Sequence, residues 1–163
     1  MKYNGWDIEY LESIDDYTAV FDLMMAKDPE GQTENLENAI AEYTGRKHCV
    51  SMANATDALR FSLMGIWEGD EVLVTDFSWI STSSCISHVG ATPVFCDIDP
   101  DSYHISIESI KRMKSDKTKA LIYTHLYGNM TDTTEIENWC DSNGIRFIED
   151  SAQSFGSSLN GRK

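Results

Sequence analysis

Short apolar runs alternate with helix-like segments over most of this chain, and this alternation restricts its fold more than any other feature. Runs of four or five residues are followed by stretches in which apolar residues recur every three or four positions. Strands that alternate with helices form βαβ units with parallel strands and right-handed crossovers. The alternation therefore predicts a three-layer α/β/α fold, in which helices cover both faces of a mostly parallel sheet.

The boundaries of the expected elements follow from the same two periodicities and from the glycines between them. We expect a cap at Thr33 for the first helix, with Gly45 just past its end. The expected strands are residues 48–52, 71–75, 93–96, 120–123 and 145–149. The expected helices are residues 33–43, 56–65, 80–88, 106–114 and 133–142.

Residues 1–32 are acidic and weakly patterned, so we expect them to form an arm or helix outside the core. Residues 33–163 are expected to form one domain with a sizeable core. The net charge of −14 disfavours nucleic acid as a partner, because such binding relies on lysine and arginine. The first residues have no apolar signal region and no run approaches the ~18 apolar residues of a membrane span. We therefore expect a cytoplasmic protein without a membrane partner.

Metal sites are weakly supported by the sequence. No two of the four histidines have the spacing of zinc ligands, and the four cysteines form no C-x-x-C pair. Residues 97–108 carry acids at positions 1, 3, 5 and 12 of a calcium-loop pattern. Position 6 requires a sharp turn and holds Ser102 in place of glycine. We expect no metal, and a calcium-binding domain stays open as an alternative to a plain turn.

Residues 54–59 read Asn-Ala-Thr-Asp-Ala-Leu and open a predicted helix directly after a predicted strand. Amides at a helix N-terminus bind phosphate well, especially beside a hydroxyl. Thr56 would supply the hydroxyl, and Asp57 and Ala58 would offer free amides. The same residues also fit an ordinary helix cap, and both interpretations stay open.

Two further groups follow predicted strands. Trp79 could stack on a flat heterocycle or could be a core aromatic. Asp150 ends a short apolar run, and an acid at that place points into the crevice where open α/β sheets bind ligands. An aspartate can keep the pyridine nitrogen of pyridoxal phosphate (PLP) protonated, and Gln153 could donate to the ring oxygen. Alternatively, Glu149 and Asp150 are loop carboxylates near a helix start.

The order of these motifs resembles that of the DegT/StrS family of PLP-dependent sugar aminotransferases, which have fold type I. The resemblance extends from about Thr33 to Lys163. Its anchors are residues 54–59, 69–72, 77–79, 90–95, 97–99, 125–128 and 149–153.

The resemblance implies PLP as the cofactor and assigns a part of it to each motif. Thr56, with the amides of Asp57 and Ala58, would hold the phosphate, and Trp79 would stack on the ring. Asp150 would pair with the pyridine nitrogen and Gln153 would contact the ring oxygen. Ala55 stands where the family commonly has glycine, which is tolerated only if its φ stays negative.

The resemblance further implies an enzyme that moves an amino group from a donor such as glutamate to a keto-sugar nucleotide. Family members are generally homodimers. Their Schiff-base lysine is expected beyond Lys163, so no catalytic residue is expected in this chain, which would be a large domain without the C-terminal small domain. The alternatives are a non-catalytic binding or assembly module, one half of a split enzyme, and a PLP-type sugar dehydratase.

Overall fold

The computed structural model describes residues 2–3, 6–7 and 31–162, in two compact units that comprise residues 1–51 and 52–163. The first unit contains the antiparallel pair β1 (Lys2–Tyr3) and β2 (Trp6–Asp7) and the helix α2 (Gln32–Thr44). Most of the predicted N-terminal arm or helix lies outside the described residues. The predicted domain boundary after residue 32 stays a prediction.

Helix α2 confirms the first expected helix at its end and corrects its beginning. Gly45 follows the helix with a φ of 69°, in the left-handed region that glycine tolerates. The cap position is Gly31 with a φ of 90°, and no side chain caps the helix. The predicted cap at Thr33 is wrong, because the turn at Gly31 lets the helix begin earlier and places Thr33 inside it.

The predicted strand at residues 48–52 is also wrong. None of these residues belongs to a strand, and the Val50 side chain is 69% exposed. Ser51 instead donates from its amide and its hydroxyl to Oε1 of Glu37, at 2.7 and 2.8 Å. An apolar run becomes a strand only where another strand pairs with it, and local sequence does not supply that partner.

The second unit contains one parallel sheet with the strand order β4-β3-β5-β6. Its strands are β3 (Glu71–Thr75), β4 (Thr92–Cys96), β5 (Thr118–Thr124) and β6 (Arg146–Asp150). Its helices are α3 (Ala55–Ser62), α4 (Ile80–His88), α5 (Ile107–Met113), α6 (Thr134–Asn143) and the short 3-10 helix η2 (Leu126–Gly128).

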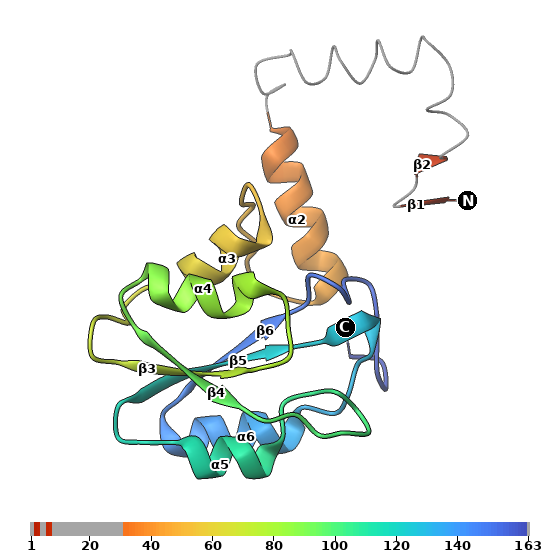
Figure 1. The fold of residues 1–163 in the computed structure, drawn as a ribbon. Coiled ribbons are helices and arrows are strands. Elements are labelled where there is room, and N and C mark those ends of the chain that lie inside the picture. Colours follow the sequence, from red (N-terminus) through yellow and green to blue (C-terminus); the bar gives the residue numbers. More distant parts are fainter. Residues whose placement is uncertain (1, 4–5, 8–30, 163) are drawn as a thin grey trace. The chain divides into compact units, whose positions relative to one another are not determined.

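Helices cover both faces of this sheet, so the predicted three-layer α/β/α fold is confirmed. Helices α3 and α4 lie on one face, and α5 and α6 lie on the other (Figure 1). Each face has its own apolar core, one containing Leu63, Val74 and Ile86, and the other Leu121 and Ile110. Leu59 of α3, and Leu63 and Ile66 just after the helix, are all buried in the first of these cores.

Alternation along β6 separates two neighbouring acids. Successive side chains of a strand point to opposite faces of the sheet. Ile148 packs in the core under α3 and α4, and Phe147 packs against the core under α5 and α6. Asp150 therefore faces the α3/α4 layer, and Glu149 faces the α5/α6 layer.

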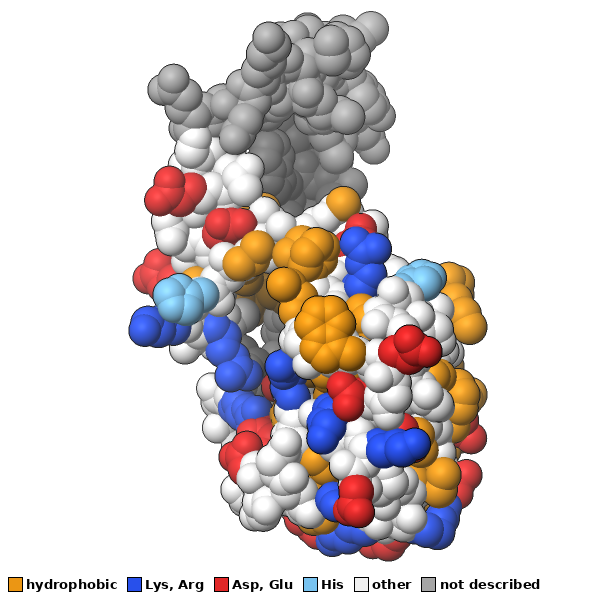
Figure 2. Space-filling model, turned by 90° about the vertical axis from the view of Figure 1, so that its left-hand side faces the viewer, with side chains coloured by type: hydrophobic (Ala, Val, Ile, Leu, Met, Phe, Trp, Pro, Cys, Tyr) orange, Lys and Arg blue, Asp and Glu red, His pale blue; other side chains and the backbone are white. Residues whose placement is uncertain are grey.

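The surface of the second unit carries mixed charge. Figure 2 shows acidic and basic side chains interspersed with apolar ones over the lower part of the molecule. The exposed apolar side chains at the end of α3 and just beyond it are Phe61, Met64 and Trp67. No helix in the described part of the chain is long and apolar enough to cross a membrane.

Candidate active site

The strand order places a crevice at the carboxyl ends of β3 and β5. From β3 the chain crosses to β4 on one side, and it then returns to β5 on the other side of β3. Where connections diverge in this way, the loops leave a gap that binds ligands in open α/β sheets. The residues predicted to bind the cofactor follow or face these strand ends.

The first turns of α3 and α4 meet through a pair of hydroxyls. The Thr56 hydroxyl donates to the Ser81 hydroxyl at 2.8 Å. Both residues belong to the first turn of their helix, so the positive ends of two helix dipoles lie side by side. This arrangement suits a phosphate better than one helix N-terminus would.

The amides of α3 correct one prediction. The Asp57 amide donates to Oδ1 of Asn54 at 2.9 Å, and the Ala58 amide donates to the Asn54 carbonyl at 3.1 Å. The prediction that these two amides are free is therefore wrong, because Asn54 caps the helix and occupies both. Among the first four residues of α3, the amides of Ala55 and Thr56 donate to no described group.

Ala55 fits this helix start without strain. It is the first residue of α3 and is not among the described non-glycine residues with positive φ, which are Tyr103, Tyr127 and Asn160. A methyl group is tolerated at a helical φ. The alanine therefore leaves the geometry of the loop intact.

Asp150 is the last residue of β6 and is only 8% exposed. Its Oδ2 accepts from the Thr82 hydroxyl at 3.3 Å, and its Oδ1 accepts from the Ala152 amide at 3.1 Å. Residues 151–156 form turns and no helix. The interpretation of Asp150 as a loop carboxylate near a helix start is wrong, because the strand continues to Asp150 and buries it.

Trp79 and Gln153 line one hollow of about 280 Å³ together with residues 76–78, Leu126 and Tyr127. The Trp79 side chain is 71% exposed, so the interpretation as a core aromatic is wrong. Gln153 accepts through Oε1 from the Tyr127 amide at 2.9 Å. Because the amide oxygen is fixed in this way, the NH₂ group of Gln153 is left as the donor that a ligand oxygen could accept from.

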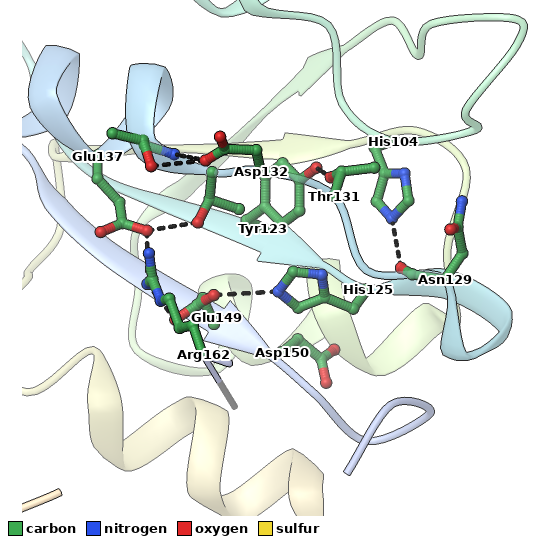
Figure 3. A network of polar contacts seen from close by, with 12 residues as sticks. His104, Tyr123, His125, Asn129, Thr131, Asp132, Glu137, Glu149, Asp150 and Arg162 are labelled. Atoms are coloured by element: carbon green, nitrogen blue, oxygen red, sulfur yellow. Dashed lines mark hydrogen bonds and ion pairs between the residues drawn. The ribbon is translucent and has the colours of Figure 1, made fainter. Parts of the chain in front are cut away.

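On the opposite face of the sheet, His125 and Glu149 form a polar network (Figure 3). The His125 side chain is fully buried, and its Nε2 lies 3.0 Å from Oε1 of Glu149. Arg162 approaches both Glu149, at 3.5 Å, and Glu137, at 2.6 Å. His125 thus pairs with a carboxylate of the neighbouring strand β6.

The calcium-loop pattern folds as a turn in which the carboxylates of Asp97 and Asp99 have partners within the protein. Oδ1 of Asp99 accepts from the amides of Asp101 and Ser102, at 3.1 and 2.8 Å. Asp97 pairs with Arg112 at 2.6 Å. Within the described residues, no cluster of three or more His, Cys, Asp or Glu side chains is placed to hold a metal ion.

Three hydroxyl residues of the site were not identified from the sequence, namely Ser78, Ser81 and Thr82. Ser78 and Thr82 are separated by four positions around the start of a predicted helix, which places them on one side of that turn. That spacing beside Trp79 was a usable signal. Hydroxyl residues are common at helix starts, so nothing local distinguished these three from caps.

Residues 14–163 match the family model described as "DegT/DnrJ/EryC1/StrS aminotransferase family". The chain belongs to this family. A curated relative, the UDP-2-acetamido-2-deoxy-3-oxo-D-glucuronate aminotransferase of Pseudomonas aeruginosa, is 38% identical over 81% of this chain and 37% of its own length. The chain spans about a third of the length of the curated relatives it matches.

Solved structures of similar proteins share the fold. The aminotransferase from Psychrobacter cryohalolentis superposes with a TM-score of 0.85 at 32% identity, over 93% of this chain and 40% of that one. The Escherichia coli GDP-4-keto-6-deoxy-D-mannose-3-dehydratase, solved with bound hydrated PLP, gives 0.80 at 26% identity, over 99% of this chain and 42% of that one. The prediction of PLP as the cofactor of this family is confirmed.

Proposed function

We propose that this chain forms the cofactor-binding part of a PLP-dependent aminotransferase that acts on a keto-sugar nucleotide, with an amino acid such as glutamate as donor. The family and the similarity to an aminotransferase of a UDP-linked keto sugar support the reaction class. The arrangement of the site's own residues supports the binding of the cofactor.

The first turn of α4 gives this proposal its main support. Residues from each part of the predicted site contact this turn or line a hollow with Trp79, the residue before the helix. Ser81 accepts from Thr56, which opens the phosphate-binding helix. Thr82 donates to Asp150. Trp79, at the cap of α4, shares its hollow with Gln153. The start of α3 and the segment at the end of β6, which are distant in the sequence, therefore converge on one turn.

The side chains present fit a phosphorylated pyridine. The free amides of Ala55 and Thr56, with the Thr56 hydroxyl, would hold the phosphate. The exposed Trp79 ring would cover one face of the pyridine. Asp57 and Ala58 would contribute through the helix they belong to, since Asn54 occupies their amides.

At the other end of the ring, Asp150 would hold a proton on the pyridine nitrogen, and Gln153 would donate to the ring oxygen. When bound, PLP supplies an electron sink for reactions at the carbon that carries the amino group. Asp150 is suited to its part because it is buried and because two protein donors, Thr82 and Ala152, already hold its oxygens in place.

Fluorescence titration with pyridoxamine 5′-phosphate tests this proposal. This aminated form of the cofactor lacks the aldehyde, so it does not couple to surface lysines. We expect saturable quenching of tryptophan fluorescence that is largely lost in Trp79→Phe, because the stacked ring is the reporter. Asp150→Asn should weaken binding about tenfold or more, since a hydrogen bond to a charged group contributes about 1.5–3 kcal/mol.

Trp67→Phe is the matched control. Trp67 is 69% exposed, nearly as much as Trp79, but it precedes β3 at the opposite end of that strand. Its replacement should leave the ligand-induced quenching in place. Absence of saturable binding by the unaltered chain, or equal quenching in the Trp79 and Trp67 variants, contradicts the proposal.

A PLP-type dehydratase is the second candidate. The observation in its favour is the similarity to the Escherichia coli dehydratase over 99% of this chain. Incubation of the complete enzyme with a keto-sugar nucleotide, PLP and ¹⁵N-labelled glutamate separates the two. Label in the sugar product identifies an aminotransferase, and a deoxy keto-sugar without label identifies a dehydratase.

A further inference from the structure

Thr82 places a buried hydroxyl against the carboxylate of Asp150. The side chain is 1% exposed and comes from the first turn of α4. Its oxygen lies 3.3 Å from Oδ2 of Asp150 and 2.9 Å from the Ser78 hydroxyl. Buried hydroxyl groups are almost always hydrogen-bonded, and these two contacts are the ones available to Thr82.

The direction of the hydrogen bonds among Ser78, Thr82 and Asp150 follows from the number of protons that each group can donate. An ionised carboxylate only accepts, so Thr82 must donate its single proton to Asp150. Because the proton of Thr82 goes to Asp150, Ser78 is the donor in the 2.9 Å contact with Thr82. The other hydroxyl near Ser78, that of Thr124, lies at 3.5 Å and is the weaker acceptor. Both hydroxyl protons therefore point toward Asp150, and the chain runs from Ser78 through Thr82 to the carboxylate.

The 3.3 Å contact is longer than an ordinary hydrogen bond between oxygens. Ser78 precedes Trp79, which caps α4, so the same turn carries the proposed ring-stacking residue and the donor of the hydroxyl chain. A ring seated against Trp79 would press on the turn that orients Asp150.

We propose that Thr82 is a positioning residue for Asp150, and that Ser78 fixes the direction in which Thr82 donates. In this role Thr82 does not touch the cofactor. It holds Oδ2 in place so that the carboxylate keeps its charge and its orientation toward a pyridine nitrogen. The inference rests on the proposed function, because it concerns the residue that would hold the ring proton.

Binding and NMR of pyridoxamine 5′-phosphate labelled with ¹⁵N in the ring test this role in the 163-residue chain. The ring ¹⁵N shift reports whether the pyridine nitrogen is protonated. We expect Thr82→Val, which keeps the shape and removes the hydroxyl, to weaken binding about tenfold and to move the ¹⁵N signal toward that of neutral pyridine. Thr82→Ser should restore both, and Ser78→Ala should move the ¹⁵N signal in the same direction by a smaller amount.

Thr124→Val is the matched control. Thr124 is buried and pairs with Asp150 in the sheet register. Its hydroxyl lies 3.5 Å from that of Ser78, and no hydrogen bond joins it to the carboxylate. Its replacement should leave the ¹⁵N signal of the bound ligand unchanged. A ¹⁵N signal in Thr82→Val equal to that of the unaltered chain overturns the role of Thr82 while leaving the proposed function intact. Failure of the unaltered chain to bind the ligand overturns both.

If Thr82→Val does not fold, the pair Ser78→Ala and Thr82→Ser decides the question. An unshifted signal in Ser78→Ala contradicts the directed chain of hydroxyls. If the ring ¹⁵N signal moves as far in Thr82→Ser as in Ser78→Ala, then the hydroxyl of residue 82 does not position Asp150.

Discussion

Two adjacent carboxylates at the end of β6 show how position alone separates their roles. Asp150 points toward α4 and the crevice, where hydroxyl and amide donors hold it. Glu149 points to the other face, where it lies between a buried imidazole and an arginine. The two acids are chemically similar, but successive side chains of a strand point to opposite faces. Asp150 therefore lies in the candidate site, and Glu149 lies in a polar network on the other face of the sheet.

Removing the Glu149 carboxylate should therefore destabilise the fold. In Glu149→Ala the buried Nε2 of His125 loses its partner, and an unsatisfied buried group costs about 1–3 kcal/mol. Glu149→Gln keeps an acceptor and should lose less. Urea denaturation measures the loss of unfolding free energy. Glu135→Ala is the control, because the exposed pair of Glu135 and Lys111 contributes within about 0.5 kcal/mol.

A result in which both the Glu149 and the Glu135 variants are as stable as the unaltered chain would show that the network contributes nothing. The sequence predicted that Asp150 lies at the end of a strand, because a short apolar run ends there in two carboxylates. It did not predict the pairing of Glu149 with His125, because these residues are 24 positions apart and only the β5–β6 register brings them together.

At the scale of elements, helix α3 is held at both ends by side chains. Asn54 caps its start through the Asp57 amide. Arg146, the first residue of β6, donates to the carbonyls of Ser62 and Met64, at 2.7 and 3.0 Å. These carbonyls belong to the last residue of α3 and to the turn after it, so the sheet itself fixes the helix that carries Thr56.

We expect Arg146→Met to loosen α3 from its C-terminal end. Two hydrogen bonds to carbonyls are lost while the aliphatic stem is kept, and the loss of stability should be about 1–2 kcal/mol. Hydrogen exchange should show faster opening of α3 amides. Arg60→Met is the control, because Arg60 pairs only locally with Asp57 and Phe61 and should change stability by about 0.5 kcal/mol or less.

Equal exchange of α3 amides in the two variants would exclude the anchoring role.

The elements themselves differ in how well sequence predicts them. Strand β3 and helix α4 agree with prediction at both ends, because polar residues and glycine bound a clear apolar pattern. Strand β5 begins at Thr118 and ends at Thr124, outside the predicted 120–123, because polar residues also pair between neighbouring strands. The length of β5 depends on those pairings and not on its own composition.

At the scale of the whole molecule, a stack of rings underlies the α5/α6 side of the sheet. His104 is 3% exposed and stacks on Tyr123, with ring centroids 5.5 Å apart. Burial lowers the pKa of His104 below its ordinary value, and the hydrogen bond from its Nε2 to the Asn129 carbonyl only partly opposes this effect. The folded protein therefore favours the neutral imidazole more than the unfolded chain does.

Stability should then depend on pH in a defined direction. Above the unfolded-state pKa of about 6.5, His104 is neutral in both states and its contribution is fully present. Below that pH the unfolded chain takes up the proton first, so stability falls as pH decreases, by at most about 1.4 kcal/mol per pH unit. Denaturation from pH 7.5 to 5.5 should show this slope.

The variant His104→Gln, which retains a donor for the Asn129 carbonyl but does not titrate, should flatten that slope. His88→Gln is the control, since His88 lies at the exposed end of α4. An unchanged slope in His104→Gln would assign the acid sensitivity to other groups. The sequence did not predict the burial of His104, because this histidine lies in an acidic turn and no pattern around it indicates a buried ring.

The strand order also determines how this sheet can be extended. Within the described residues, β4 and β6 are its two edge strands. Strand β4 contains Pro93, which lacks an amide hydrogen and makes that edge a poor template for pairing. Strand β6 contains no proline. An additional strand would therefore join at β6, and it would clamp the backbone of Asp150 from a second side and stiffen that part of the site.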